Sequence, residues 1–240
     1  MRLTASDNQK LRAAFAACKL ADIDLAVVSE GKIRGLSDSK CAAIFSELEL
    51  SIDPTITLGI TRLSELGKRL ELFGDDILIE GELNNDKKVK KLSIKGKTGK
   101  IEFRCTDVAL LERKYPKAHS EEVGTVITLS KAEVALISKG VRTLGAEQMT
   151  IQVKRDGAVR IESVDSSNDR FELDIASPAE FVEDPIPSVN SYNTTSSGVL
   201  LKLIEHTVRE ADNTQLMVMK SGNIGLKAYG HDILAIPRII

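Results

Sequence analysis

Apolar residues recur at helical spacing in four stretches of the chain, and each stretch predicts a helix with one face turned toward a core. The four stretches are Asn8 to Leu20, Arg62 to Phe73, Lys131 to Gly145 and Ser197 to Ala211. The second and third share the same apolar steps, three, four and three residues apart. These positions are Leu63, Leu66, Leu70 and Phe73 in one stretch and Val134, Ile137, Val141 and Leu144 in the other. A single narrow stripe of this kind predicts a helix that covers a core and leaves its opposite face to solvent.

Between the helices, short runs of alternating apolar and polar residues predict strands. The same order of predicted elements occurs in both halves of the chain, which indicates an internal repeat. Glu30 to Ser39 resembles Asp156 to Ser166, because each has an acidic residue and a glycine at a turn, a short alternating strand, and then Asp-Ser. Further strands and a closing hairpin follow at matching places in each half. They are Ala43 to Leu50, Asp76 to Gly81 and the hairpin Lys90 to Thr106 in the first half, and Arg170 to Ile175, Gln215 to Lys220 and the hairpin Asn223 to Ile239 in the second.

A repeat of this length predicts two similar domains, because the units of a solenoid are much shorter. We expect one domain over residues 1–107, a linker over 108–124 and a second domain over 125–240. A second irregular stretch, Ser177 to Ser196, predicts a long surface loop. Few helices among many short alternating strands favour an α+β fold, in which antiparallel sheets carry the helices on one face.

The composition, with 42% hydrophobic and 28% charged residues, is typical of a globular protein. No apolar run is long enough to span a membrane and the N-terminus has no signal-peptide core, so we expect an intracellular protein without a membrane partner. Cys18, Cys41 and Cys105 match neither a zinc site nor a disulfide framework, which predicts buried free thiols.

The net charge of −2 leaves room for a nucleic-acid surface only if the positive charge is segregated. The helical spacing favours such segregation, because Lys68 and Lys139 fall opposite the apolar stripes of their helices. All four predicted helices place basic residues away from the sheet, whereas many acidic residues fall in loops and strands. The candidate DNA contacts are Arg12, Lys19, Lys68, Lys131, Lys139, Arg142, Lys202 and Arg209. The simpler alternative for any one helix is an ordinary solvated face.

Catalytic chemistry is not indicated by any motif. The three histidines, His119, His206 and His231, have no metal-ligand spacing, and the chain contains no phosphate-binding loop, dinucleotide fingerprint or nucleophile elbow. We therefore expect a protein that is not an enzyme and needs no cofactor or metal.

Together these residues resemble the DNA sliding-clamp family, which includes proliferating cell nuclear antigen and the clamps of T4-like bacteriophages. The resemblance covers essentially the whole chain. It is carried by the duplicated pattern, by the mid-chain segment Arg113 to Lys117 and by the C-terminal segment Asp232 to Ile239. The short length is more similar to a phage clamp, in which case the protein would act in the host cytoplasm.

The resemblance implies a ring of six domains with helices lining the hole, and hence a homotrimer of this two-domain chain. It implies that the strand Lys100 to Cys105 of one chain pairs with the strand Arg170 to Ile175 of the next. The implied apolar contacts at this subunit interface are Ile101, Phe103, Phe171, Leu173 and Ile175. It also implies a pocket for partner peptides lined by Ala42, Ile44, Leu110, Leu111, Tyr115, Ala235, Ile236 and Pro237.

The function implied is that of a DNA polymerase processivity factor, which encircles duplex DNA without reading its sequence. Its partners would be the replicative DNA polymerase and a separate ATP-driven clamp loader. Three alternatives stay open. One is a monomeric or hetero-oligomeric polymerase accessory subunit of the same fold, as in herpesviruses, which binds DNA without encircling it. The others are a protein-interaction scaffold and an enzyme whose motif is not recognisable.

Overall fold

A computed structural model describes residues 1–74, 77–111, 122–146, 148–182, 190–194 and 197–236. The chain divides into two compact units, one comprising Met1–His119 with Tyr229–His231 and the other Ser120–Ala228 with Asp232–Ile240. Each unit combines two main helices with antiparallel strands, which confirms the α+β class predicted from the sequence.

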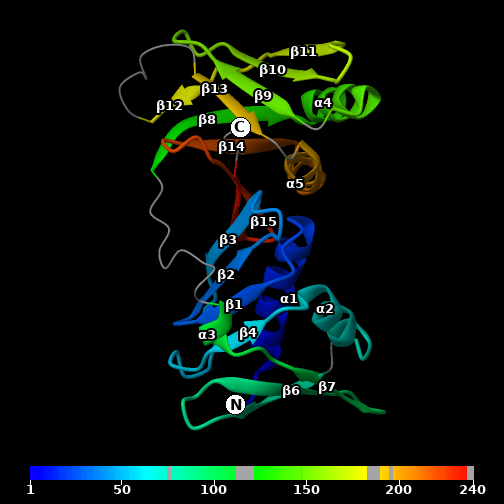
Figure 1. Ribbon diagram of the computed structural model, residues 1–240, viewed down its shortest axis with the longest axis vertical. Coiled ribbons are helices and arrows are strands. Elements are labelled where there is room, and N and C mark those ends of the chain that lie inside the picture. The colour runs from blue at the N-terminus through cyan, green and yellow to red at the C-terminus, as the bar shows by residue number, and fades with distance from the viewer. Residues whose placement is uncertain (75–76, 112–121, 147, 183–189, 195–196, 237–240) are drawn as a thin grey trace. The chain divides into compact units, whose positions relative to one another are not determined.

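The first unit opens with a helix and closes with a three-stranded hairpin sheet (Figure 1). Its elements are α1 (Ala5–Leu20), β1 (Ala26–Ser29), β2 (Lys32–Leu36), β3 (Ala42–Glu47), β4 (Leu58–Ile60), α2 (Leu63–Glu71), β5 (Leu78–Leu83), β6 (Val89–Lys95), β7 (Lys100–Arg104) and α3 (Val108–Leu111). The strands are ordered β3-β2-β1-β4 and β5-β6-β7. Helices α1 and α2 pack against each other.

The second unit has the same kinds of element, and it opens with a strand before its first helix. Its elements are β8 (Val123–Ser130), α4 (Lys131–Leu144), β9 (Met149–Val153), β10 (Val159–Val164), β11 (Arg170–Ile175), β12 (Glu180–Phe181), β13 (Asn190–Thr194), α5 (Ser197–Glu210), β14 (Asn213–Met219), β15 (Ile224–Ala228) and β16 (His231–Ala235). The strands are ordered β12-β8-β14-β15-β16 and β11-β10-β9-β13. Helix α4 packs on α5 and on β8, β10 and β11, and α5 packs on β14 and β15.

The predicted apolar stripes form the core contacts of the helices. Leu66 and Leu70 of α2 and Val134, Ile137 and Val141 of α4 are all buried. Alternate residues of the strands are buried beneath them, as β10 shows with Val159 and Ile161 inside and Arg160 and Glu162 partly exposed. On the sheet that contains β10 and β11, α4 therefore covers the apolar face and the opposite face is left to polar side chains.

Several strands escape prediction from the sequence pattern. All four residues of β1 are buried, so the strand has no alternation by which to recognise it. The stretch 177–196, expected to be a loop, contains β12 and β13, and β13 pairs with β9 from Asn190 opposite Val153 to Thr194 opposite Met149. The expected linker, 108–124, begins with the short helix α3 and ends inside β8. Pairing with distant strands overrides the local turn signals in these segments.

The helices α1 and α4 begin with equivalent capping boxes. Thr4 caps α1 and shares hydrogen bonds with Asp7, and Ser130 caps α4 and shares them with Glu133. The second carboxylate oxygen of each acid reaches the chain just beyond the third strand after the capped helix, β3 in one unit and β11 in the other. Asp7 Oδ1 accepts from the Ser51 N–H at 2.7 Å, and Glu133 Oε1 accepts from the Ala176 N–H at 2.8 Å. The internal repeat thus extends to individual hydrogen bonds.

These capping acids predict how stability depends on pH. Burial alone raises the pKa of Asp7, but hydrogen bonds from Ser51 and Thr4 outweigh it, so that the pKa is lowered, and the pKa of Glu133 is lowered against burial in the same way. A lowered pKa in the folded state means stabilisation that is complete above the unfolded value, about 4, and lost as the pH falls through the folded value. We expect Asp7→Asn and Glu133→Gln each to lower the free energy of unfolding at neutral pH by about 1 kcal/mol.

Urea unfolding at neutral pH and below pH ~4 measures this effect, because the difference between each variant and the parent should narrow in acid. Glu71→Gln is the matched control, since Glu71 is exposed on α2 and is not part of a capping box. If the difference in free energy of unfolding between variant and parent is the same at both pH values, the stabilisation does not come from the ionised capping acids.

Candidate nucleic-acid interface and edge strands

The four main helices each expose basic side chains on the face away from the core. Lys19 lies on α1, Lys68 on α2, Lys131 and Lys139 on α4, and all four are exposed. Lys202 and Arg209 on α5 are exposed as well. The helical spacing of the apolar stripe determines this placement, because a lysine opposite the stripe must point away from the sheet.

The candidate DNA contacts Arg142 and Arg12 bind groups within the chain. Arg142 is exposed, but its guanidinium pairs with Glu205 at 2.7 Å and so links α4 to α5. Arg12 is half-buried and donates to the Leu70 carbonyl oxygen at 2.8 Å and to the Gly74 carbonyl oxygen. Arg12 therefore fastens α1 to the C-terminal end of α2, where carbonyl groups favour a cation.

Acidic residues near these lysines are partly neutralised. On α2, Glu65 pairs with Arg62 at 3.1 Å and with Arg69 at 3.6 Å. Among the residues that the structure describes, Lys68 and Lys139 form no ion pair, so their charges face solvent. Mobile, uncompensated ammonium groups suit contacts with phosphates, which need no fixed register.

Each unit also has a strand at the edge of a sheet. Strand β7 ends the order β5-β6-β7, and β11 ends the order β11-β10-β9-β13. In the described part of the chain, neither strand has a neighbour on its outer side. The unpaired N–H and C=O groups of such an edge are a template for pairing with another strand.

The apolar residues of these two strands differ in their exposure. Ile101, Phe171 and Leu173 are half-buried, whereas Phe103 and Ile175 are only 1% and 8% exposed. The Phe103 ring is covered by its own unit, since the guanidinium carbons of Arg62 and Arg69 each lie 5.2 Å from its centroid. Cations placed over an aromatic face are attracted by its electrons. Phe103 and Ile175 therefore belong mainly to the interior, and Ile101, Phe171 and Leu173 remain accessible along the edges.

Phe171 is seated by a glycine of the neighbouring helix. A side-chain carbon built on Gly140 of α4 would lie 2.3 Å from the Phe171 ring, so the ring rests directly on the helix backbone. The sequence offers no sign of this contact, because residues 140 and 171 are distant in the chain. Leu136, on the same helix, is 51% exposed.

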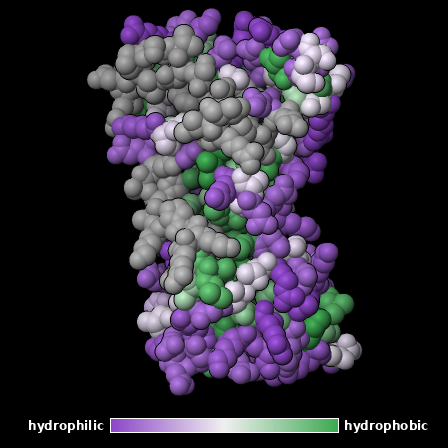
Figure 2. All heavy atoms as spheres, in the orientation of Figure 1, coloured by the Kyte–Doolittle hydropathy of each residue, from purple (hydrophilic) through white to green (hydrophobic). Residues whose placement is uncertain are grey.

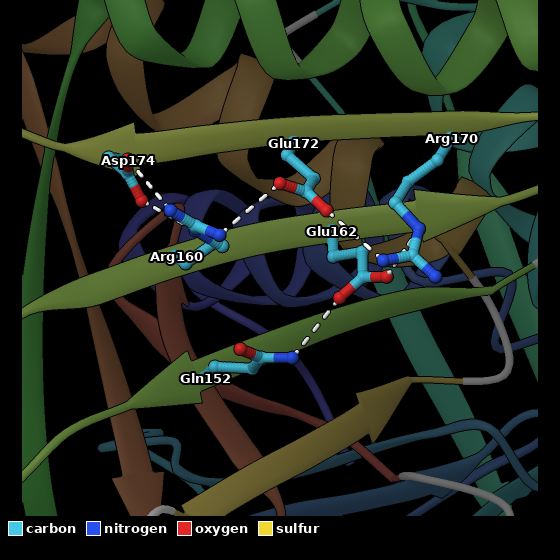
Figure 3. Close-up of polar contacts among 6 residues, drawn as sticks. All are labelled: Gln152, Arg160, Glu162, Arg170, Glu172 and Asp174. Carbon is cyan, nitrogen blue, oxygen red and sulfur yellow. Dashed lines mark hydrogen bonds and ion pairs between the residues drawn. The ribbon is translucent and has the colours of Figure 1, made fainter.

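The outer face of β9, β10 and β11 carries a network of ion pairs (Figure 3). Arg160 pairs with Asp174 at 2.6 Å and with Glu172 at 3.2 Å, and Arg170 pairs with Glu162 at 3.1 Å. The hydrogen bond from Arg160 lowers the pKa of Asp174.

The sheet β5-β6-β7 of the first unit also carries ion pairs. Lys91 bridges Glu82 and Glu102 at 3.3 Å each. Figure 2 shows a mostly hydrophilic surface over β5–β7, at the bottom of the view. These exposed pairs contribute little stability each, but they neutralise the outer faces.

The residues expected to form a partner-peptide pocket are divided between the interior and the surface. Ala42, Ile44, Leu111 and Ala235 are buried, and Leu111 packs with Val27 and Val108 in a small apolar cluster. Leu110 of α3 is 65% exposed, and Ile236 is half-buried. Tyr115 and Pro237 lie outside the described residues. The pocket therefore stays a prediction, with Leu110 as its most accessible side chain.

The part of the chain that the structure describes contains no cluster of metal ligands. No group of three His, Cys, Asp or Glu residues there could hold a metal ion. None of the described helices is long and apolar enough to cross a membrane. Burial raises the pKa of the Cys18 and Cys105 thiols to about 12, so that both are protonated at neutral pH. Protonated thiols are poor nucleophiles and poor metal ligands.

The arrangement of two similar units, each with paired helices over antiparallel sheets, is a two-domain clamp-like fold. Among solved structures, the chain is similar to one described as the C-terminal region of FEN-1 bound to A. fulgidus PCNA. The match has a TM-score of 0.59 and 14% sequence identity, and it covers 100% of this chain and 98% of that chain. At this identity the similarity is one of fold. No protein-family model matches the chain, and neither does the sequence of any curated protein.

Proposed function

We propose that the chain is a DNA sliding clamp: three copies form a ring around duplex DNA and tether a replicative DNA polymerase to it. The observation that carries the proposal is the clamp-like fold over the whole chain, in which each unit has both a basic helix pair and an edge strand. The helices supply the surface for DNA, and the edges supply the contact between copies. A fold of this kind is typically not that of an enzyme.

The chemistry of the helix surface supports binding that ignores sequence. Lys68, Lys139 and Arg209 are exposed on helices and suit contact with phosphate oxygens more than with base edges. A ring that encloses DNA cannot leave sideways, so weak and mobile contacts are enough to hold it while it slides. The low net charge of −2 agrees with this arrangement, because positive charge is needed only on the inner surface.

The proposed partners follow from this mechanism. A closed ring has to be opened around DNA, which calls for a separate ATP-driven clamp loader. The polymerase would bind the ring through a short apolar segment near Leu110, a large apolar side chain of α3 that is exposed. Such a protein works where DNA is replicated inside the cell, which for a phage-encoded chain is the host cytoplasm.

A second candidate is an accessory subunit of the same fold that binds DNA without forming a ring. One feature favours it: both edge strands carry charged side chains, Lys100, Glu102 and Arg104 on β7 and Arg170, Glu172 and Asp174 on β11. Charges on an edge strand commonly prevent pairing between sheets. The two candidates differ in mass and in their dependence on the ends of DNA.

Light scattering over a dilution series separates these candidates. We expect a mass near three times the 26.2 kDa of the chain. In a second measurement, the protein is allowed to thread onto linear duplex DNA and the DNA ends are then blocked. The protein should remain on this DNA through a high-salt wash. The control is the same DNA cut by a restriction enzyme, from which a ring should slide off. A monomeric mass, or retention that ignores the ends, would favour the accessory subunit.

A further inference from the structure

The two edge strands carry the same charge pattern. Strand β7 begins with Lys100-Ile101-Glu102, and β11 begins with Arg170-Phe171-Glu172. In both strands a cation and a glutamate, two residues apart, point to the outer face, and an apolar residue between them points toward the helices. Antiparallel pairing reverses one copy of such a pattern, which brings each cation opposite a glutamate and the two apolar residues opposite each other.

We propose that β7 of one copy pairs antiparallel with β11 of the next in the register that sets Lys100 opposite Glu172 and Glu102 opposite Arg170. Ile101 then faces Phe171 at the centre. The inference rests on the proposed ring and specifies its self-contact. Each copy offers β7 in its first unit and β11 in its second, and pairing between two different strands is the head-to-tail contact that a cyclic assembly requires.

Among the residues that the structure describes, these charges form ion pairs along their own strands or with neighbours in their own sheet. Lys100 lies 2.7 Å from Glu102, and Arg170 lies 3.2 Å from Glu172, with half-exposed side chains in both pairs. Figure 3 shows Arg170 and Glu172 on the outer face of β11. Exposed pairs of this kind contribute little. Directly opposite residues of paired strands have Cβ atoms about 5 Å apart, so a neighbouring strand adds a second, opposite charge within reach of each of these side chains.

The alternation of side chains limits the choice of register. Only shifts of an even number of residues keep the apolar side chains on the helix side. Moving the partner by two residues so that Lys100 faces Asp174 also brings Glu102 opposite Glu172. Moving it by two residues in the other direction sets Lys100 against Arg170. The register with Lys100 opposite Asp174 overlaps the two strands more fully than the proposed register does, so overlap does not favour the proposed one. Charge distinguishes the two registers, because like charges directly opposite each other destabilise a strand pair.

The position of Phe103 agrees with this register. Phe103 is 1% exposed beneath Arg62 and Arg69, so it needs no partner from another copy. In the proposed register it lies opposite Asp169, beyond the start of β11 at Arg170. With Lys100 opposite Asp174 it would instead face Phe171, although its ring is already covered. Of the three accessible apolar side chains, Ile101 and Phe171 meet, and Leu173 lies opposite Gly99, just before the start of β7.

Exchanging charges within each strand tests the register without changing composition or net charge. The β7 exchange is Lys100→Glu with Glu102→Lys, and the β11 exchange is Arg170→Glu with Glu172→Arg. Each exchange alone sets like charges opposite each other in the proposed register, and both together restore opposite charges. We expect each single exchange to shift the trimer's dissociation on dilution to a concentration on the order of tenfold higher or more, and the combined variant to return toward the parent.

Light scattering on the four proteins has distinct outcomes. A trimer indifferent to the β7 exchange, or a combined variant that stays dissociated, overturns the register but leaves the ring. A dimer indifferent to the β7 exchange indicates two-fold pairing of β7 with itself, which overturns both the register and the ring. A monomeric parent protein also overturns both.

Disulfide trapping gives a second measurement that does not rely on charge. Lys100→Cys with Glu172→Cys should form multimers linked by disulfides, because directly opposed residues meet disulfide geometry. Lys100→Cys with Asp174→Cys is the matched control and should remain largely unlinked, as should each single variant. Preferential linkage of the control pair would overturn the register.

Discussion

Reversing the charge of Lys68, Lys139 and Arg209 together is expected to weaken binding to duplex DNA by roughly 100-fold at moderate salt. Each is exposed on a helix and placed to meet a phosphate. The slope of log affinity against log salt concentration should fall by about three, because each lost phosphate contact removes about one unit. Fluorescence anisotropy with two duplexes of unrelated sequence measures both quantities, and the loss should be the same for each duplex.

The control variant reverses three exposed lysines that lie outside the main helices: Lys90, Lys154 and Lys227. It changes the net charge by the same amount, so it separates a specific surface from a general effect of charge. We expect its salt slope to stay close to that of the parent protein. Equal losses for the two variants would show that the helices are not the DNA surface.

Replacing Gly140 by alanine is expected to lower the free energy of unfolding of the second unit by about 1–3 kcal/mol. The added methyl group would lie 2.3 Å from the Phe171 ring, which must then leave its place on α4. Displacing Phe171 also disturbs β11, so we expect self-association to weaken as well as stability. Denaturant unfolding and light scattering on the same sample follow both effects.

Gly67→Ala is the matched control for this substitution. Gly67 also lies inside a helix, α2, but a side-chain carbon built there meets nothing within 4 Å. Alanine has a higher helix propensity than glycine, so this variant should be more stable by about 0.5–1 kcal/mol. The prediction for Gly140 fails if both variants change stability in the same direction.

The helices were the most predictable elements, because their signal is local. The pattern of Lys131 to Gly145 predicts α4 almost to the residue, with the apolar stripe and the capping Ser130 in agreement. The pattern beginning at Asn8 misses the first turn of α1, which starts at Ala5 because Thr4 and Asp7 form a capping box. Strand β1 has no alternation, and only its pairing with β2 and β4 reveals it.

The candidate site was predictable to a similar extent and for the same reason. A helical repeat tells which face of α2 or α4 carries Lys68 or Lys139, and both are exposed. The helical repeat does not predict which residues of other elements pack beside a helix. Arg12, on the flank of α1, meets the last carbonyl groups of α2. Arg62 and Arg69 cover Phe103 across more than thirty residues of sequence. Such contacts depend on how elements pack, which no local pattern records.

Helix α2 is held at both ends by residues from α1 and from the segment that follows it. Asp24 accepts from the Ser64 N–H at 2.7 Å at its start, and Arg12 donates to Leu70 and Gly74 at its end. The helix has only 9 residues and its own N-cap, Arg62, provides no capping side chain. Helices this short are marginal alone in water. A fluctuation that detaches α1 removes the Arg12 contact at the end of α2, and one that also displaces the following segment with Asp24 removes the contact at its start. We therefore expect the two helices and this segment to open as one cooperative unit of local unfolding.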